Sequence, residues 1–145
     1  NTTFSCFLLY FAEKLLPETE HRCFRHVVTE AGRVEAAVER MLAADIRGFG
    51  DYMNASHDSL KTDYQVSTEV LDELVQVARD GGAVGARLTG AGFGGCVVAL
   101  AERRRTRDVL GALRAEYYER RGRKNQMDEH LFIAVPSRGA SVQVI

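Results

Sequence analysis

The sequence has no tryptophan, only two prolines and three cysteines, and almost no excess of one charge. The cysteines, Cys6, Cys23 and Cys96, are odd in number and form neither a CxxC pair nor a disulfide framework, so we expect a reducing, cytoplasmic environment. The 19 basic and 20 acidic residues give a formal net charge of -1. A chain with almost no net charge has no strong electrostatic field to attract nucleic acid or an anionic membrane. We therefore expect neither as a partner.

Long hydrophobic runs are also missing. Residues 4–12 are the only place where a membrane segment could be considered, and this run is too short because a bilayer span takes about 20 apolar residues. The three residues before it carry no positive charge, unlike those of a secretory signal. We predict a core strand or helix here, with an interaction edge as the alternative. Because the chain starts at Asn1 rather than methionine, we treat residues 1–21 as an apolar segment of uncertain origin, compatible with a truncated start.

The composition that is present indicates a soluble globular domain. The chain has 145 residues, of which 46% are hydrophobic and 27% are charged, the size and composition of an ordinary single domain. No internal repeat or low-complexity linker interrupts it. We therefore expect no domain boundary within residues 22–145.

Apolar periodicity predicts two helices in the first part of the chain. In one, after Pro17, apolar residues recur at steps of three and four and share a face. They are Phe24, Val27, Val28, Ala31, Val34, Val38, Met41 and Leu42. Asp45 can cap the next helix, which ends within residues 56–63. Its inward-facing residues are Ile46, Phe49 and Met53.

A third helix is predicted before the glycine-rich part of the chain. Ser67 is its expected N-cap, with a hydrophobic staple between Val66 and Leu71. It ends at Gly81 and Gly82. Its buried residues are Val70, Leu71, Leu74, Val75 and Ala78.

Strands are predicted in the second part. Apolar stretches at residues 83–89 and 96–101 flank a glycine-rich loop, and residues 130–136 form a last strand. Between them Thr106 can cap a fourth helix, which ends by Gly122 and turns inward Val109, Leu110, Leu113 and Tyr117. This order predicts an α+β fold with helices packed on one face of an antiparallel sheet. If residues 4–11 add a strand, the arrangement becomes ferredoxin-like.

The glycine-rich loop carries the strongest functional signal. Glycines at 90, 92, 94 and 95 alternate with Ala91 and Phe93. Glycine adopts positive φ and lets backbone approach a ligand, and successive amides in such a turn bind anions. No Lys-Ser or Lys-Thr pair follows, as a Walker loop requires, and a strand rather than a dinucleotide-binding helix comes next. A tight strand connection with a bulge is the alternative.

The stretch GARLTGAGFGGCVVAL, from Gly85 to Leu100, resembles the third signature motif of the sugar and metabolite kinase superfamily that contains galactokinase, mevalonate kinase and homoserine kinase. Residues 25–74 are similar to the galactokinase branch, through the SH, SL and DYQVS runs at residues 56–57, 59–60 and 63–67. Phe93 between two glycines favours the same branch, and FIAVPSRGASV at residues 132–142 is similar to the close of galactokinases. The resemblance covers residues 22–145, about the last third of a whole galactokinase.

The resemblance implies a fold, a site and cofactors. It implies the C-terminal domain of a GHMP-type kinase, with a loop that lies against the nucleotide phosphates and the sugar pocket and contacts them through backbone amides. The residues of this loop are Thr89, Gly90, Ala91, Gly92, Phe93, Gly94 and Gly95. Ala91 stands where many relatives have glycine. ATP and Mg²⁺ are the cofactors of the intact parent, which phosphorylates galactose at its anomeric hydroxyl.

The sequence also lacks several motifs of the family that it resembles. The family's sugar-binding motif, its Ser-rich phosphate loop and its catalytic aspartate precede the matched segment and do not occur here. We therefore expect the chain alone to be inactive, with no catalytic and no metal-binding residue of its own. Its expected partners are a missing N-terminal kinase domain or a second copy. A non-catalytic sugar- and nucleotide-binding regulatory module, or a dimerisation domain built on residues 4–11, are alternatives.

Two further patterns are weighed against ordinary structural roles. His21, Cys23 and His26 have a spacing that could hold a soft metal, but at the start of a helix we expect a buried Cys23 and exposed histidines. The basic run at residues 103–107 suggests nucleic acid, but in a charge-balanced chain a solvated turn before a helix is favoured.

Polar residues in and just before the DYQVS run could also have a function. His57 beside Asp58 could suggest an acid–base pair, yet adjacent residues on a helix point in different directions, so we expect His57 to cap or to pack. We predict that Asp63, Tyr64 and Ser67 are structural and fix the turn that supports the glycine loop.

Overall fold

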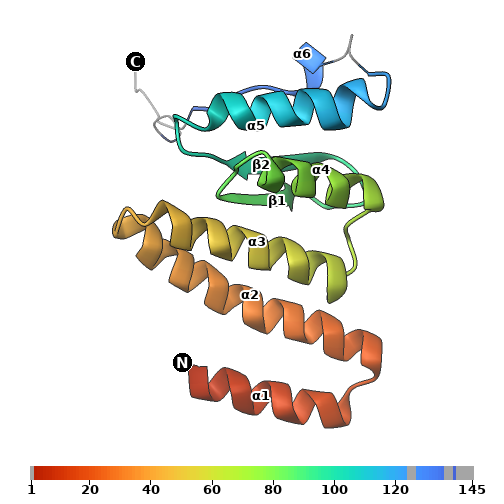
Figure 1. The fold of residues 1–145 in the computed structure, drawn as a ribbon. Coiled ribbons are helices and arrows are strands. Elements are labelled where there is room, and N and C mark those ends of the chain that lie inside the picture. The colour runs from red at the N-terminus through yellow and green to blue at the C-terminus, as the bar shows by residue number, and fades with distance from the viewer. Residues whose placement is uncertain (1, 124–126, 136–138, 140–145) are drawn as a thin grey trace, which may run out of the picture.

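The computed structural model describes residues 2–123, 127–135 and 139. Its elements are α1 (Thr2–Leu15), α2 (Glu18–Leu42), α3 (Ile46–Thr62), α4 (Glu69–Asp80), β1 (Gly85–Thr89), β2 (Cys96–Leu100), α5 (Thr106–Ala112), the π-helical turn η1 (Leu113–Glu119) and α6 (Met127–His130). Figure 1 shows α1, α2 and α3 side by side, β1 next to α3, and α4 lying across the sheet with α5 beyond it. The predicted α+β class is confirmed.

The sheet is a two-stranded antiparallel hairpin in the described part of the chain. Gly85 pairs with Leu100 at its base and Thr89 with Cys96 at its tip, as the alternating apolar stretches predicted. Of the other two segments considered as strands, residues 4–11 adopt the helical alternative, and the strand predicted for residues 130–136 is wrong in the described part of the chain. Residues 4–11 lie within α1, where Phe7 and Phe11 are four residues apart and their ring centroids lie 4.6 Å from each other. Residues 131–135 are irregular and Pro136 lies outside the described residues.

Helix α2 forms where periodicity predicted it, but its apolar face is not the buried one. The apolar residues expected inside are largely exposed: Val27 by 59%, Val34 by 56%, Met41 by 60%. The neighbouring, more polar face meets α3 and buries His26, while Val34, Val38 and Met41 line a groove between the two helices. Polar side chains of α2 and α3 form hydrogen bonds across this contact, among them His26 with Ser59 and Glu30 with Ser56.

Helix α3 approaches β1 closely and closes its outer edge. The Asp45 carboxylate caps the helix by accepting from the Gly48 amide at 2.9 Å, as predicted. A Cβ at Gly50 would lie 2.3 Å from the Val84 carbonyl oxygen, so only glycine allows this approach. Asn54 then donates to the same oxygen at 3.3 Å and accepts from the Ala86 amide at 3.0 Å. The β1 edge thus has partners from a helix instead of a third strand.

Helix α4 starts one residue later than predicted. Thr68, not Ser67, caps it by accepting from the Leu71 amide at 3.3 Å, while Val66 and Leu71 share a buried cluster as expected. Val70 is 44% exposed, contrary to its predicted burial. The helix ends before Gly81, as the glycine pair indicated.

Two apolar clusters stabilise the part of the molecule around the sheet. The larger joins α4, β1, α5 and η1, and its buried members are Val75, Val77, Ala78, Ala86, Val109, Leu113, Tyr117, Tyr118 and Met127. The smaller contains Leu60, Val66, Leu71 and Leu88. Arg105 rather than Thr106 occupies the N-cap of α5, although the predicted inner face is otherwise right. Among the described residues no helix is both long and apolar enough to span a bilayer.

Candidate functional site

The glycine-rich loop forms the exposed tip of the β1–β2 hairpin. Gly90, Gly92, Gly94 and Gly95 all have positive φ, of 85°, 83°, 131° and 86°. Phe93 also has a positive φ, of 58°, and its side chain is 73% exposed. Ala91 is not among the positive-φ residues, so its methyl group is compatible with the turn. The loop therefore needs glycine for its backbone path at four positions.

The turn between α3 and α4 holds this loop in place. The Phe93 amide donates to the Val66 carbonyl oxygen at 2.7 Å, and a Cβ at Gly92 would lie 2.3 Å from the same oxygen. Gln65 adopts a positive φ of 58° just before this contact. The prediction that the DYQVS turn supports the glycine loop is confirmed.

The remaining loop amides have no hydrogen-bond partner in the described part of the chain. They are the amides of Gly90, Ala91, Gly92, Gly94 and Gly95. Several N–H groups without an internal acceptor in one hairpin loop make a segment suited to an anion. The Phe93 amide is already used inside the protein and adds nothing to that segment.

A buried polar network fixes the supporting turn. Ser59 donates its only hydroxyl proton to Asp63 at 3.0 Å, so its oxygen accepts from His26 Nδ1 at 2.9 Å. Arg25 also donates to Asp63, through Nε at 3.1 Å, and the Tyr64 ring stacks on His26 with centroids 4.8 Å apart. Burial opposes ionisation of Asp63, but the hydrogen bonds from Arg25 and Ser59 bring its pKa below the usual value. Asp63 and Tyr64 are structural, as expected.

The same network includes His26, one of the three residues considered for a metal site. His21 and His26 are buried and Cys23 is half-buried, the reverse of the predicted exposure, because His26 is hydrogen-bonded between the two helices. The described part of the chain holds no group of three His, Cys, Asp or Glu side chains arranged for a metal ion.

His57 and Asp58 contact different partners, which confirms that they form no acid–base pair. His57 is 2% exposed and accepts from the Leu88 amide at Nδ1, while Asp58 pairs with Arg79 at 3.2 Å. The basic run lies in the turn before α5, where Arg104 contacts Glu102 and Arg105 contacts Asp108. It is a solvated turn, as expected.

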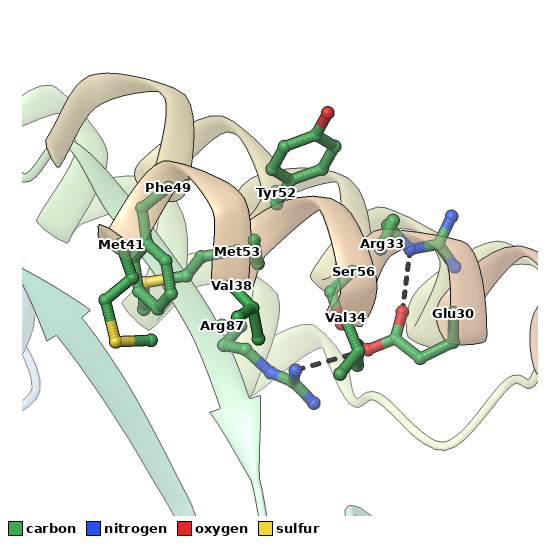
Figure 2. A pocket seen from close by; sticks show the side chains of 11 residues that line it. Glu30, Arg33, Val34, Val38, Met41, Phe49, Tyr52, Met53, Ser56 and Arg87 are labelled. Carbon is green, nitrogen blue, oxygen red and sulfur yellow. Dashed lines mark hydrogen bonds and ion pairs between the residues drawn. The ribbon is translucent and has the colours of Figure 1, made fainter. Parts of the chain in front are cut away.

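A groove between α2 and α3 was not predicted (Figure 2). It has a volume of about 210 Å³ and a mainly apolar lining that includes Val38, Met41 and Phe49. Glu30 lies at one end and accepts from Ser56 at 2.5 Å and from Arg33 at 2.7 Å, while Arg87 approaches to 3.3 Å. These partners neutralise the carboxylate, which leaves little charge for a ligand. Sequence reasoning missed the groove because it placed the apolar face of α2 inside.

Comparison with known proteins explains the glycine hairpin and the turn beneath it. A family model described as GHMP kinases C terminal matches residues 34–119, more than half of the chain. The chain belongs to this family. Its resemblance to galactokinase, predicted from the loop and the DYQVS run, is also confirmed by relatives named as such.

The relatives of this GHMP kinase chain include galactokinases of several bacteria. The galactokinase of Actinobacillus succinogenes is 39% identical over 125 residues, which cover 85% of this chain and 31% of that protein. The Roseiflexus galactokinase is 45% identical over 109 residues, 74% of this chain and 28% of that protein. The chain spans about a third, or less, of the length of these curated relatives.

Solved structures give the same picture. Lactococcus lactis galactokinase complexed with galactose is 39% identical, with a TM-score of 0.68 over 74% of this chain and 28% of that one. L. major mevalonate kinase in complex with R-mevalonate is 27% identical, with a TM-score of 0.59 over 80% of this chain and 35% of that one. The chain is thus similar to part of a galactokinase-like sugar kinase.

Proposed function

We propose that residues 22–145 are the C-terminal domain of a galactokinase-like sugar kinase that acts in the cytoplasm. The parent reaction is the ATP-dependent phosphorylation of galactose at its anomeric hydroxyl. The observation that carries this proposal is the exposed glycine hairpin, with four glycines at positive φ and the middle of its loop bonded to Val66 through the Phe93 amide. The family membership and the galactokinase relatives support the choice of reaction and sugar.

The hairpin would line the phosphate side of the active site. Phosphoryl transfer depends on positioning and on neutralising charge at the phosphate oxygens, and fixed amide donors supply both without rearranging during the reaction. The loop residues in this role are Thr89, Gly90, Ala91, Gly92, Phe93, Gly94 and Gly95. Phe93 would contribute its exposed ring and its backbone position, because its amide is bonded to Val66.

The described residues suit ATP better than Mg²⁺, the other cofactor of the parent family. Loop amides without an internal acceptor at the hairpin tip suit the phosphates of ATP. The described residues offer no cluster of acidic side chains for Mg²⁺, so the chain does not fit the ion by itself, and we assign it no metal-dependent step. We also propose that the 145-residue chain transfers no phosphate unaided, since the family's other motifs do not occur in it.

A matched pair of glycine variants tests the role of the hairpin. Gly90 and Gly92 have nearly equal φ, but a Cβ at Gly92 would meet the Val66 oxygen at 2.3 Å, whereas one at Gly90 has nothing within 4 Å. Gly92→Ala should therefore raise the KM for ATP by about tenfold or more, and Gly90→Ala by clearly less. The measurement is ADP release, with galactose and ATP, by the complete gene product that carries this segment.

Three outcomes would contradict the proposal. A complete protein that releases no ADP with galactose would remove the proposed activity. Equal KM values for ATP in Gly92→Ala and the unmodified protein would remove the role of the loop. Turnover of galactose by the isolated chain, measured beside calorimetric titration with ATP and Mg²⁺, would show that catalysis does not need the rest of a kinase.

A further inference from the structure

His57, in α3, contacts Leu88 of β1 and Asp72 of α4. Figure 1 shows where these three elements lie. The side chain of His57 is almost completely buried. Nδ1 accepts from the Leu88 amide at 3.3 Å, and Nε2 lies 3.4 Å from Asp72 Oδ1. One imidazole ring thus joins the strand that leads into the glycine loop to the first turns of α4.

The geometry determines which nitrogen carries the proton. A backbone amide can only donate, so Nδ1 must be unprotonated to accept from Leu88. The proton of the neutral ring is then on Nε2, facing the Asp72 carboxylate. Asp72 is itself held by Ser67 at 2.6 Å and by Lys61 at 2.9 Å. Each group in this chain of contacts has one defined donor or acceptor role.

Burial, more than the surrounding charges, favours the neutral ring. Burial, and then the positive charge of Arg79, lower the pKa of His57, while Asp72 and Asp58 act in the opposite direction and Lys61 adds to the lowering. At neutral pH the ring therefore retains the free lone pair that Leu88 requires.

The same turn reaches the glycine loop by two routes. Val66 accepts directly from Phe93 in the middle of the loop. Its neighbour Ser67 reaches the start of the loop through Asp72, His57 and Leu88, the residue immediately before Thr89. Fixing both points defines where the loop amides lie relative to the rest of the domain.

We propose that His57 is a positioning residue that holds the Leu88 amide and so sets the place of the glycine loop against a bound nucleotide. Leu88 is 1% exposed, and without an acceptor its amide would be a buried, unpaired donor. An apolar side chain of similar size would fill the space and leave that amide unsatisfied. The proposal rests on the proposed function, because the nucleotide belongs to it.

The tautomer can be measured without any variant. In the ¹⁵N-labelled chain, the two imidazole nitrogens of His57 are distinguished by their chemical shifts and their couplings to ring protons. We expect the Nε2-protonated form at pH 7.5. A ring protonated on Nδ1, or on both nitrogens, would overturn the proposal, and this result does not depend on whether the protein is a kinase.

Two substitutions of His57 distinguish a positioning role from a packing role. Asparagine places an acceptor oxygen near the position of Nδ1, whereas glutamine reaches the position of Nε2 and leaves the Leu88 amide without an acceptor. Hydrogen exchange of the Leu88 amide should be about tenfold faster in His57→Gln than in His57→Asn, the effect of one net hydrogen bond. Equal exchange in the two variants would contradict the anchoring role.

Kinetics of the complete protein provide the functional readout. His57→Gln should raise the KM for ATP about tenfold over His57→Asn, the effect of one hydrogen bond, with little difference in the KM for galactose. Equal KM values for ATP despite unequal Leu88 exchange would overturn the effect on the loop. Absence of galactose phosphorylation in the unmodified protein would instead refute the proposed function, and the tautomer and exchange results would still decide whether His57 anchors the strand.

Discussion

The two halves of this domain are held together by different interactions. In the sheet half, formed by α4, β1, β2, α5 and η1, the contact surfaces are apolar, and Val75, Ala78 and Ala86 are at most 1% exposed. In the helical half, formed by α1, α2 and α3, the α2–α3 contact is polar and includes the bond between His26 and Ser59. Similar apolar periodicity therefore leads to a buried apolar face in α4 but to a largely exposed one in α2.

The two kinds of contact contribute differently: apolar burial contributes mainly stability, and hydrogen bonds contribute mainly defined geometry. Burial of apolar area supplies most of the stability and is not directional. Hydrogen-bonded buried groups contribute less net free energy, but each has to meet its partner at a defined distance and angle. The polar network begins under the turn that holds the glycine loop, where precise placement matters most for the proposed function.

The largest expected effect is in the sheet half. Leu113→Ala removes a side chain that is 6% exposed in the main cluster and should lower the free energy of unfolding by about 3 kcal/mol. The matched change Leu42→Ala, at a position 85% exposed on α2, should stay within about 0.5 kcal/mol. Urea denaturation of both variants measures the contrast, and equal losses would contradict it.

A smaller effect is expected in the helical half. Ser59→Ala removes the hydroxyl that links His26 to Asp63 and should cost about 1–2 kcal/mol, because buried polar groups lose their partner. Thr62→Ala, in the same helix, removes an exposed hydroxyl that donates to the Asp58 carbonyl and is the control. A loss for Ser59→Ala no greater than that of the control would show that the network does not stabilise the α2–α3 contact.

The smallest effect concerns pH. Burial lowers the pKa values of His26 and His57 below the ordinary 6.5. At pH below 6.5 the unfolded chain then binds more protons than the folded one, so stability falls as pH decreases. The urea midpoint should be lower at pH 5.5 than at pH 7.5, and less so in His57→Asn. A midpoint that rises on acidification would contradict this assignment.

Local features were predicted well from sequence. The Asp45 cap, the end of α4 at Gly81 and the hairpin around the glycine loop all follow from residue type and spacing. The errors have physical causes. Ser67 and Thr68 are both suitable caps, and the choice depended on Asp72 binding Ser67. Residues 4–11 suited either a strand or a helix by apolar content, and the helix packs against α2.

The sequence by itself determined the periodicity of the helices, the positions of the glycines and the family to which the chain belongs, because these depend on local chemistry. The tertiary structure alone decided which face of α2 is buried, which nitrogen of His57 is free, and that Val66 and Leu88 tie the loop to one turn. Those outcomes depend on pairing residues far apart in the chain, such as His57 with Leu88. A buried donor or acceptor costs free energy unless its partner arrives in the right place, and only the folded arrangement of α3, α4 and β1 brings these partners together.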